Sequence, residues 1–205
     1  NTTIRNVAAN DPGDAIGQSI RIRDGSDYTR ILNSTFEGAG VIQLHSAAHT
    51  RIENTLIDPE APNALSLYES PDTVLENVTV SPQRSFSDGA SGTAVDIELG
   101  SERLTVLNST ISNNDGRGIN LARAHGSVIR DSVIQDNGGY GIRTENDITT
   151  ATIAGNIISG NDGDGVFLDN RAQNNVITGN EITDNTANGI ELDPDGENTT
   201  IRNNV

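Results

Sequence analysis

The chain reads VLNSTI at 106–111 and repeats that phrase as IRDSVI at 129–134, IAGNII at 153–158 and ITGNEI at 177–182. Upstream the phrase stands as ILNSTF at 31–36, IENTLI at 52–57 and LENVTV at 75–80. A second phrase follows at a fixed offset, as GINL at 118–121, GIRT at 141–144, GVFL at 165–168 and GIEL at 189–192. Both phrases alternate β-branched and polar residues between Gly, Asn and Asp, which is typical of short strands. Two strand phrases in each repeat of about 24 residues predict a repeat architecture.

The turns between the phrases are too short for crossover helices, so parallel strands must stack coil upon coil. The sequence therefore predicts an all-β fold: a single right-handed parallel β-helix, or solenoid, of about eight coils spanning residues 1–205. Its interior is expected to hold two apolar ladders. The first consists of Ile31, Ile52, Val106, Ile129, Ile153, Ile177 and Ile201. The second consists of Phe36, Ile57, Val80, Ile111, Ile134, Ile158 and Ile182.

The third position of the first phrase is restricted in residue type. Only Asn, Asp and Gly occur there, at Asn6, Asn33, Asn54, Asn77, Asn108, Asp131, Gly155, Gly179 and Asn203. These residue types tolerate a positive φ better than others. We therefore expect a left-handed residue at a bend between two strands, with Asn side chains stacked from coil to coil.

Composition limits the partners and the environment. The formal net charge is −16, and all 13 basic residues are arginine. High salt screens the self-repulsion of such a surface, which predicts a halophilic or marine source; an acidic extracellular protein is the alternative. The charge argues against nucleic acid and anionic membranes as partners. No cysteine is present, and no apolar run approaches the roughly 20 residues of a membrane span.

Two features concern chain organisation. Residues 1–6 and 198–203 both read NTTIRN, which predicts that the chain is a segment of a longer solenoid. Residues 81–93, SPQRSFSDGASGT, form an insertion that delays the second phrase, AVDI at 94–97, whereas VIQL at 41–44 arrives early. Insertions in repeat folds often carry binding residues, and a neutral surface insertion is an equal alternative.

The second phrase predicts a working face, because the residues between its apolar positions point outward. One outward row contains Gln43, Ser66, Asp96, Asn120, Arg143, Phe167 and Glu191. The next contains His45, Tyr68, Glu98, Ala122, Glu145, Asp169 and Asp193. Strand spacing of about 4.8 Å suits an extended sugar chain. The predicted carbohydrate ligands are Gln43, His45, Tyr68, Asn120, Arg143, Glu145, Phe167 and Glu191. An ordinary solvated sheet face is the alternative.

Two chemical hypotheses concern this face. Catalysis needs paired acid and base groups within reach of one bond, and the candidates are Asp96, Glu98 and Arg143. Glu145, Asp169 and Asp193 fall on successive coils, where a cation such as Ca²⁺ would offset their repulsion. A salt-screened acidic surface is the alternative to a calcium site, and no other cofactor is predicted.

The phrasing N-x-I-x-x-N followed by G-I-x-L resembles the right-handed parallel β-helix repeat proteins, which include pectate-lyase-like enzymes, NosD-type proteins and mannuronan C5-epimerases. Residues 23–50, RDGSDYTRILNSTFEGAGVIQLHSAAHT, look like the late coils of a C5-epimerase module. The Tyr-Gly-Phe-Asp-Pro-His signature of that family does not occur here, and neither does lysine. The resemblance implies an extracellular, polysaccharide-associated β-helix.

The sequence leaves the function open. One hypothesis is an extracellular or cell-surface module that binds or displays itself to polysaccharide without catalysis. The other is a carbohydrate-active enzyme, namely a polysaccharide lyase, glycoside hydrolase or C5-epimerase, that acts on an acidic polysaccharide. A structural role is a third hypothesis, in which exposed strand edges associate end to end.

Overall fold

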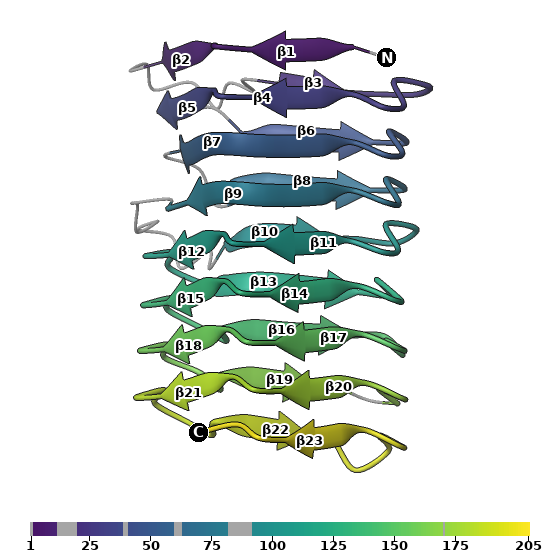
Figure 1. Cartoon of the computed structure of the whole chain (residues 1–205), viewed down its shortest axis with the longest axis vertical. Helices are drawn as coiled ribbons and strands as arrows, with labels where there is room; N and C mark the ends of the chain where they lie inside the picture. The colour runs from purple at the N-terminus through teal and green to yellow at the C-terminus, as the bar shows by residue number, and fades with distance from the viewer. Residues whose placement is uncertain (1, 12–19, 39–40, 60–62, 82–91, 170) are drawn as a thin grey trace.

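The computed structural model describes residues 2–11, 20–38, 41–59, 63–81, 92–169 and 171–205. They form a stack of β-coils with the two termini at opposite ends (Figure 1). The described part of the chain contains no helix long and apolar enough to cross a membrane. Of the insertion at 81–93, residues 82–91 lie outside the described residues.

The first strand phrase builds one continuous sheet that bends along its length. The half before the bend contains β1 (Thr3–Arg5), β4 (Arg30–Leu32), β11 (Thr105–Leu107), β14 (Val128–Arg130), β17 (Thr152–Ala154), β20 (Val176–Thr178) and β23 (Thr200–Arg202). The half after it contains β2 (Ala8–Asp11), β5 (Thr35–Gly38), β12 (Thr110–Ser112), β15 (Val133–Gln135), β18 (Ile157–Ser159) and β21 (Glu181–Thr183). The halves join because β7 (Arg51–Pro59) and β9 (Val74–Val80) run through the bend.

The second phrase builds a separate eight-stranded sheet, with one strand from each coil. Its strands are β3 (Ile20–Ile22), β6 (Ile42–His45), β8 (Leu65–Tyr68), β10 (Thr93–Ile97), β13 (Arg117–Ala122), β16 (Ile142–Glu145), β19 (Val166–Leu168) and β22 (Ile190–Leu192). Every pairing in both sheets is parallel, for example Val95 with Leu65 and Ile119. The predicted all-β right-handed β-helix is therefore confirmed.

The two apolar ladders lie inside the tube as predicted. Ile129 pairs with Val106 and Ile153, and all three side chains are buried. Ile134 pairs with Ile111 and Ile158, which are also buried. Only toward the last described coil does the ladder open to solvent, where Ile201 is 44% exposed. Burial of a continuous apolar column between sheets is the main stabilising contribution to such a fold.

The bend positions have the predicted backbone. All nine residues at the third position of the first phrase have positive φ, from 48° at Asn108 to 66° at Gly155. The exposed side chains stack in places, since Asn54 Nδ2 donates to Asn33 Oδ1 at 3.2 Å and Asn77 Nδ2 donates to Asn54 Oδ1 at 2.7 Å. The restriction to Asn, Asp and Gly thus has a conformational cause.

Buried asparagines form further ladders that the sequence analysis did not predict. In one, Asn156 Nδ2 donates to Asn180 Oδ1 at 2.9 Å, and Asn180 Nδ2 donates to Asn204 Oδ1 at 2.9 Å. In another, Asn137 Nδ2 donates to Asn161 Oδ1 at 2.9 Å, and Asn161 Nδ2 donates to Asn185 Oδ1 at 2.8 Å. These amides also bond backbone groups in the turns, which satisfies polar groups that would otherwise be buried without partners.

The glycines that open the second phrase set how closely the coils approach. A Cβ on Gly118 or Gly141 would lie 2.6 or 2.7 Å from the carbonyl oxygen of the next glycine in the stack. On Gly189, the last of the series, the nearest atom would be Ile182 Cγ2 at 3.6 Å. Glycine is therefore required at Gly118 and Gly141, where the carbonyl oxygen of the next coil approaches this closely.

Candidate functional site

The outer face of the eight-stranded sheet carries the predicted rows of polar and aromatic side chains. Strand register aligns the first row as predicted: Gln43, Ser66, Asp96, Asn120, Arg143, Phe167 and Glu191 occupy paired positions on successive strands. Arg21, which pairs with Gln43, extends this row by one strand and was not predicted. In the second row, His45 pairs with Tyr68 and Ala122 pairs with Glu145. We call this surface the sheet face.

A groove of about 410 Å³ lies at the N-terminal part of the sheet face. Its lining residues are Gln43, Leu44, His45, Asn63, Ser66, Tyr68 and Glu98. The rings of His45 and Tyr68 stack along one side, with centroids 4.9 Å apart and an angle of 19° between the planes. Arg21 Nε donates to Gln43 Oε1 at 3.0 Å. The groove thus combines a flat ring surface with amide, hydroxyl and carboxylate groups, which is the usual make-up of a site for a polar ligand.

Asp96 and Glu98 are the next carboxylates along the face. Asn120 Nδ2 donates to Asp96 Oδ1 at 3.1 Å. Burial raises the pKa of Asp96, and the charge of Glu145 adds to this increase, whereas the bond from Asn120 and the charge of Arg117 act in the opposite direction. Partial desolvation and the charge of Asp96 raise the pKa of Glu98. Asp96 and Glu98 therefore both have a raised pKa, which is common among the general acids of enzymes.

A chain of ion pairs crosses the centre of the sheet face. Arg117 Nη1 lies 2.9 Å from Glu145 Oε1, and Arg143 Nη1 lies 3.1 Å from the same oxygen. Arg143 Nη2 lies 3.1 Å from Asp169 Oδ2 on the next coil. All four side chains are one-third exposed or less. Charge-assisted bonds of this kind fix side-chain positions more firmly than bonds at an open surface.

Two aromatic rings lie beside Arg143. Tyr140 and Phe167 stack with centroids 5.2 Å apart, and Arg143 Cζ lies 5.4 Å from the Tyr140 centroid and 5.7 Å from the Phe167 centroid. Cations favour this position beside an aromatic ring. The sheet face therefore has a second aromatic surface, four coils beyond the one formed by His45 and Tyr68.

Arg117 and Tyr140 belong to the site, although the sequence analysis did not select them. Both stand directly before the glycine of the second phrase, at Gly118 and Gly141. That position recurs once in each coil, so the repeat period alone could have identified both residues. Alternation inside the phrase does not identify this position, because it precedes the glycine at which the phrase begins.

The candidate catalytic and metal residues have these surroundings. Asp96 and Arg143 lie two strands apart, with Asn120 between them in register. Arg143 binds Glu145 and Asp169, which are two of the three predicted calcium ligands. Within the described ranges, no three His, Asp or Glu groups are arranged to hold a metal ion. Calcium binding by Glu145, Asp169 and Asp193 remains a prediction.

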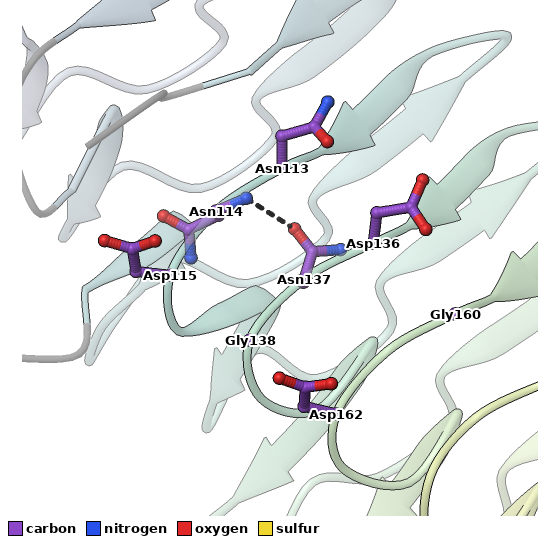
Figure 2. A pocket seen from close by; sticks show the side chains of 8 residues that line it. All are labelled: Asn113, Asn114, Asp115, Asp136, Asn137, Gly138, Gly160 and Asp162. Atoms are coloured by element: carbon purple, nitrogen blue, oxygen red, sulfur yellow. Dashed lines mark hydrogen bonds between the residues drawn. The ribbon is translucent and has the colours of Figure 1, made fainter. Parts of the chain in front are cut away.

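A larger hollow of about 520 Å³ lies away from the sheet face, at the corner where β12, β15 and β18 end. Figure 2 shows its lining residues, including Asp115, Asp136 and Asp162 on successive turns. Asn114 N donates to Asn137 Oδ1 at 3.3 Å, so part of this wall belongs to the buried asparagine ladder. The hollow has no aromatic lining. We therefore assign it to the turn structure and place the candidate site on the sheet face.

The family model described as "Right handed beta helix region" matches residues 20–205. The chain belongs to the right-handed β-helix family. No curated protein sequence shows a significant match to it. Family membership establishes the coil architecture, whereas any chemistry depends on the side chains of the sheet face.

Several solved β-helix structures are similar in fold. A mutant of the periplasmic alginate epimerase AlgG has a TM-score of 0.67 at 16% identity, covering 90% of this chain and 55% of the other. The A-module of the Azotobacter vinelandii mannuronan C-5 epimerase AlgE6 has a TM-score of 0.57 at 15% identity, covering 98% and 64%. The Streptococcus pneumoniae surface protein and adhesin PfbA has a TM-score of 0.61 at 13% identity, covering 97% and 66%. The chain thus spans 55 to 66% of these proteins.

Proposed function

We propose that this protein is an extracellular or cell-surface β-helix module whose sheet face binds an extended polysaccharide without catalysis. The observation that carries the proposal is the pair of aromatic surfaces on one face, formed by His45 with Tyr68 and by Tyr140 with Phe167. Aromatic rings bind the apolar faces of sugar rings, and the polar groups between them offer partners for hydroxyl groups.

The spacing of the face supports a chain-like ligand. Parallel strands lie about 4.8 Å apart, so polar side chains recur along the coil axis at a regular interval. The two aromatic surfaces lie at different points of that axis, on β6 with β8 and beside β16 with β19. A compact ligand would reach one surface, whereas an extended ligand reaches both.

Composition and fold neighbours support the location. A lysine-free chain of net charge −16 suits an environment in which salt screens its charges, which favours a halophilic or marine source. The neighbours in fold include a periplasmic epimerase and a surface adhesin, so a polysaccharide ligand outside the cytoplasm agrees with them.

A binding assay against an array of immobilised polysaccharides tests the proposal. The double variant Tyr68→Ala, Phe167→Ala removes one ring from each surface and should lower the affinity at least about tenfold, since buried aromatic contacts often contribute more than 1 kcal/mol each. Tyr28→Ala is the matched control, because Tyr28 is 56% exposed and stacks on His49 at a turn outside the sheet face. Equal loss in the control, or no binding by the unmodified protein, would refute the proposal.

A second candidate function is catalysis on the bound chain, and the raised pKa values of Asp96 and Glu98 favour it. A protonated carboxyl group beside a glycosidic oxygen is the general acid that glycoside hydrolysis needs. The assay measures new reducing ends, unsaturated ends and altered uronate composition. Asp96→Asn should abolish turnover while leaving binding intact; an unchanged rate would rule out Asp96 as the acid.

A further inference from the structure

We propose that the sheet face selects neutral polysaccharides and discriminates against polymers of uronic acids. This inference rests on the proposed polysaccharide-binding function and specifies its ligand. The two central guanidinium groups, Arg117 and Arg143, are both engaged by carboxylates of the protein itself.

Arg143 has little capacity left for a ligand carboxylate. Its Nη1 and Nη2 atoms contact Glu145 and Asp169, each at 3.1 Å, and its Nε–H is buried without a hydrogen-bond partner among the described residues, out of reach of a ligand in solvent. The rings of Tyr140 and Phe167 lie beside its guanidinium plane. Recognition of a carboxylate by arginine normally uses two parallel N–H donors of the fork. At Arg143 the protein's own carboxylates already contact both terminal nitrogens.

Arg117 is held in a similar way. Its Nη1 atom lies 2.9 Å from Glu145 Oε1 and donates to Asn120 Oδ1 at 3.4 Å. Glu145 therefore bridges the two guanidinium groups, and its removal would release one bond at each of them. Arg117 and Arg143 are the only cations among the described residues of β13 and β16, and this shared carboxylate contacts one terminal nitrogen of each.

Carboxylates outnumber guanidinium groups on this part of the face. Glu145 and Asp169 contact the two arginines, Asp96 and Glu98 follow one another on and just after the neighbouring strand β10, and Glu191 and Asp193 lie on the coil after Asp169. A uronate chain would bring further negative charges against partly buried carboxylates, where like charges repel more strongly than in water. Hydroxyl groups of a neutral sugar would instead donate hydrogen bonds to the same carboxylates.

The test compares the affinity of the unmodified protein for neutral polymers, laminarin and mannan, with that for alginate and polygalacturonate. At about 0.1 M salt the anionic polymers should bind at least about tenfold more weakly than the best neutral polymer, because opposing charges lower affinity most when screening is weak. Equal or tighter binding of alginate or polygalacturonate would overturn this inference while supporting the binding function. No binding to any polymer would overturn both.

A variant tests the cause of the selectivity. The double change Glu145→Gln, Asp169→Asn frees both guanidinium groups and should raise alginate affinity at least about tenfold at low salt. The matched control Glu181→Gln, Asp184→Asn changes the net charge by the same amount at exposed positions in and beside β21, outside the sheet face. It should raise the alginate affinity much less. If the double variant folds poorly, Glu145→Gln compared with Glu181→Gln gives the same comparison at equal net charge. An equal gain in variant and control would overturn the inference, since net charge would then explain it.

Discussion

Asn120 donates a hydrogen bond from its side-chain amide to Asp96 Oδ1 at 3.1 Å, across two neighbouring strands of the sheet face. This neutral donor only partly offsets the burial of the carboxylate, so the pKa of Asp96 in the folded protein stays above 3.8, its ordinary value. The native state therefore binds the proton of Asp96 more tightly than the unfolded chain does.

This raised pKa predicts a pH-dependent effect of Asp96→Asn on stability. Between pH 3.8 and the higher pKa of the folded state, the unmodified protein loses stability as pH rises, because the native state must give up a proton that it binds tightly. The variant lacks this loss, so at neutral pH it should be more stable by up to about 1 kcal/mol. The difference should vanish as the pH falls toward 3.8. Urea unfolding over a pH series measures it, and a less stable variant at neutral pH would contradict the prediction.

The glycine stack predicts a position-dependent cost of an added methyl group. Gly141→Ala would place a Cβ 2.7 Å from Gly165 O, so the two coils must separate, and we expect a loss of about 2 kcal/mol in the free energy of unfolding. Gly189→Ala is the control because its Cβ would meet nothing closer than 3.6 Å, and it should change stability by less than about 0.5 kcal/mol. Similar losses in both variants would show that coil contact is not the cause.

The buried asparagine ladder predicts a large effect at Asn156. Asn156→Ala removes the acceptor of Ser132 N at 3.0 Å and the donor to Ile129 O at 2.9 Å, which leaves buried backbone groups without their partners. A loss of about 3 kcal/mol is expected, since each such group costs about 1–3 kcal/mol. Asn108→Gly should cost less than about 1 kcal/mol, because Asn108 is exposed and its φ of 48° suits glycine. Chemical unfolding of both variants provides the comparison.

The acidic surface predicts stabilisation by salt. Raising sodium chloride from about 0.1 M to about 1 M shortens the screening length from about 10 Å to about 3 Å and should raise the melting temperature. The charge-reduced variant Glu181→Gln, Asp184→Asn should respond less steeply, because it starts with fewer repelling groups. A melting temperature that stays constant or falls with salt would count against a halophilic source.

The calcium hypothesis can be tested through Arg143. If Glu145, Asp169 and Asp193 bind calcium, Arg143→Gln should tighten that binding, because the guanidinium no longer occupies two of the three carboxylates. Calorimetric titration with calcium chloride compares the two proteins. Absence of binding heat in both would refute the site.

Much of the fold followed from residue spacing alone. The recurring Ile and Val positions predicted which side chains are buried, and the restricted third position predicted every positive φ at the bend, from Asn6 to Asn203. The early arrival of residues 41–44 did not disturb the register, since Ile42 pairs with Leu65 and Gln43 with Ser66. Alternation of inward and outward residues is a local property, so the sequence contains it directly.

Other parts of the site could not be predicted in this way. The burial of Asn156 and Asn180 was not predicted, because asparagine is mostly exposed in proteins and residue type does not reveal the backbone partners that these amides find inside. The register correctly aligned Arg143 with Asn120 and Phe167, but its contacts with Glu145 and Asp169 depend on a long side chain that has many rotamers. Residue spacing predicts the backbone position of such a side chain, whereas side-chain packing determines where its charged group lies.

The asparagine ladder has a consequence for how this protein can evolve. Each bond of the ladder, such as that between Asn156 and Asn180, joins one coil to the next, and among the described residues none closes the stack into a ring. Duplication or deletion of a segment of about 24 residues would therefore leave every remaining bond with an equivalent partner. Unequal recombination between coils can lengthen or shorten the sheet face by whole strands. If the sheet face binds a polysaccharide as proposed, such a lineage would change the number of sugar units in contact by whole steps, without redesigning a core.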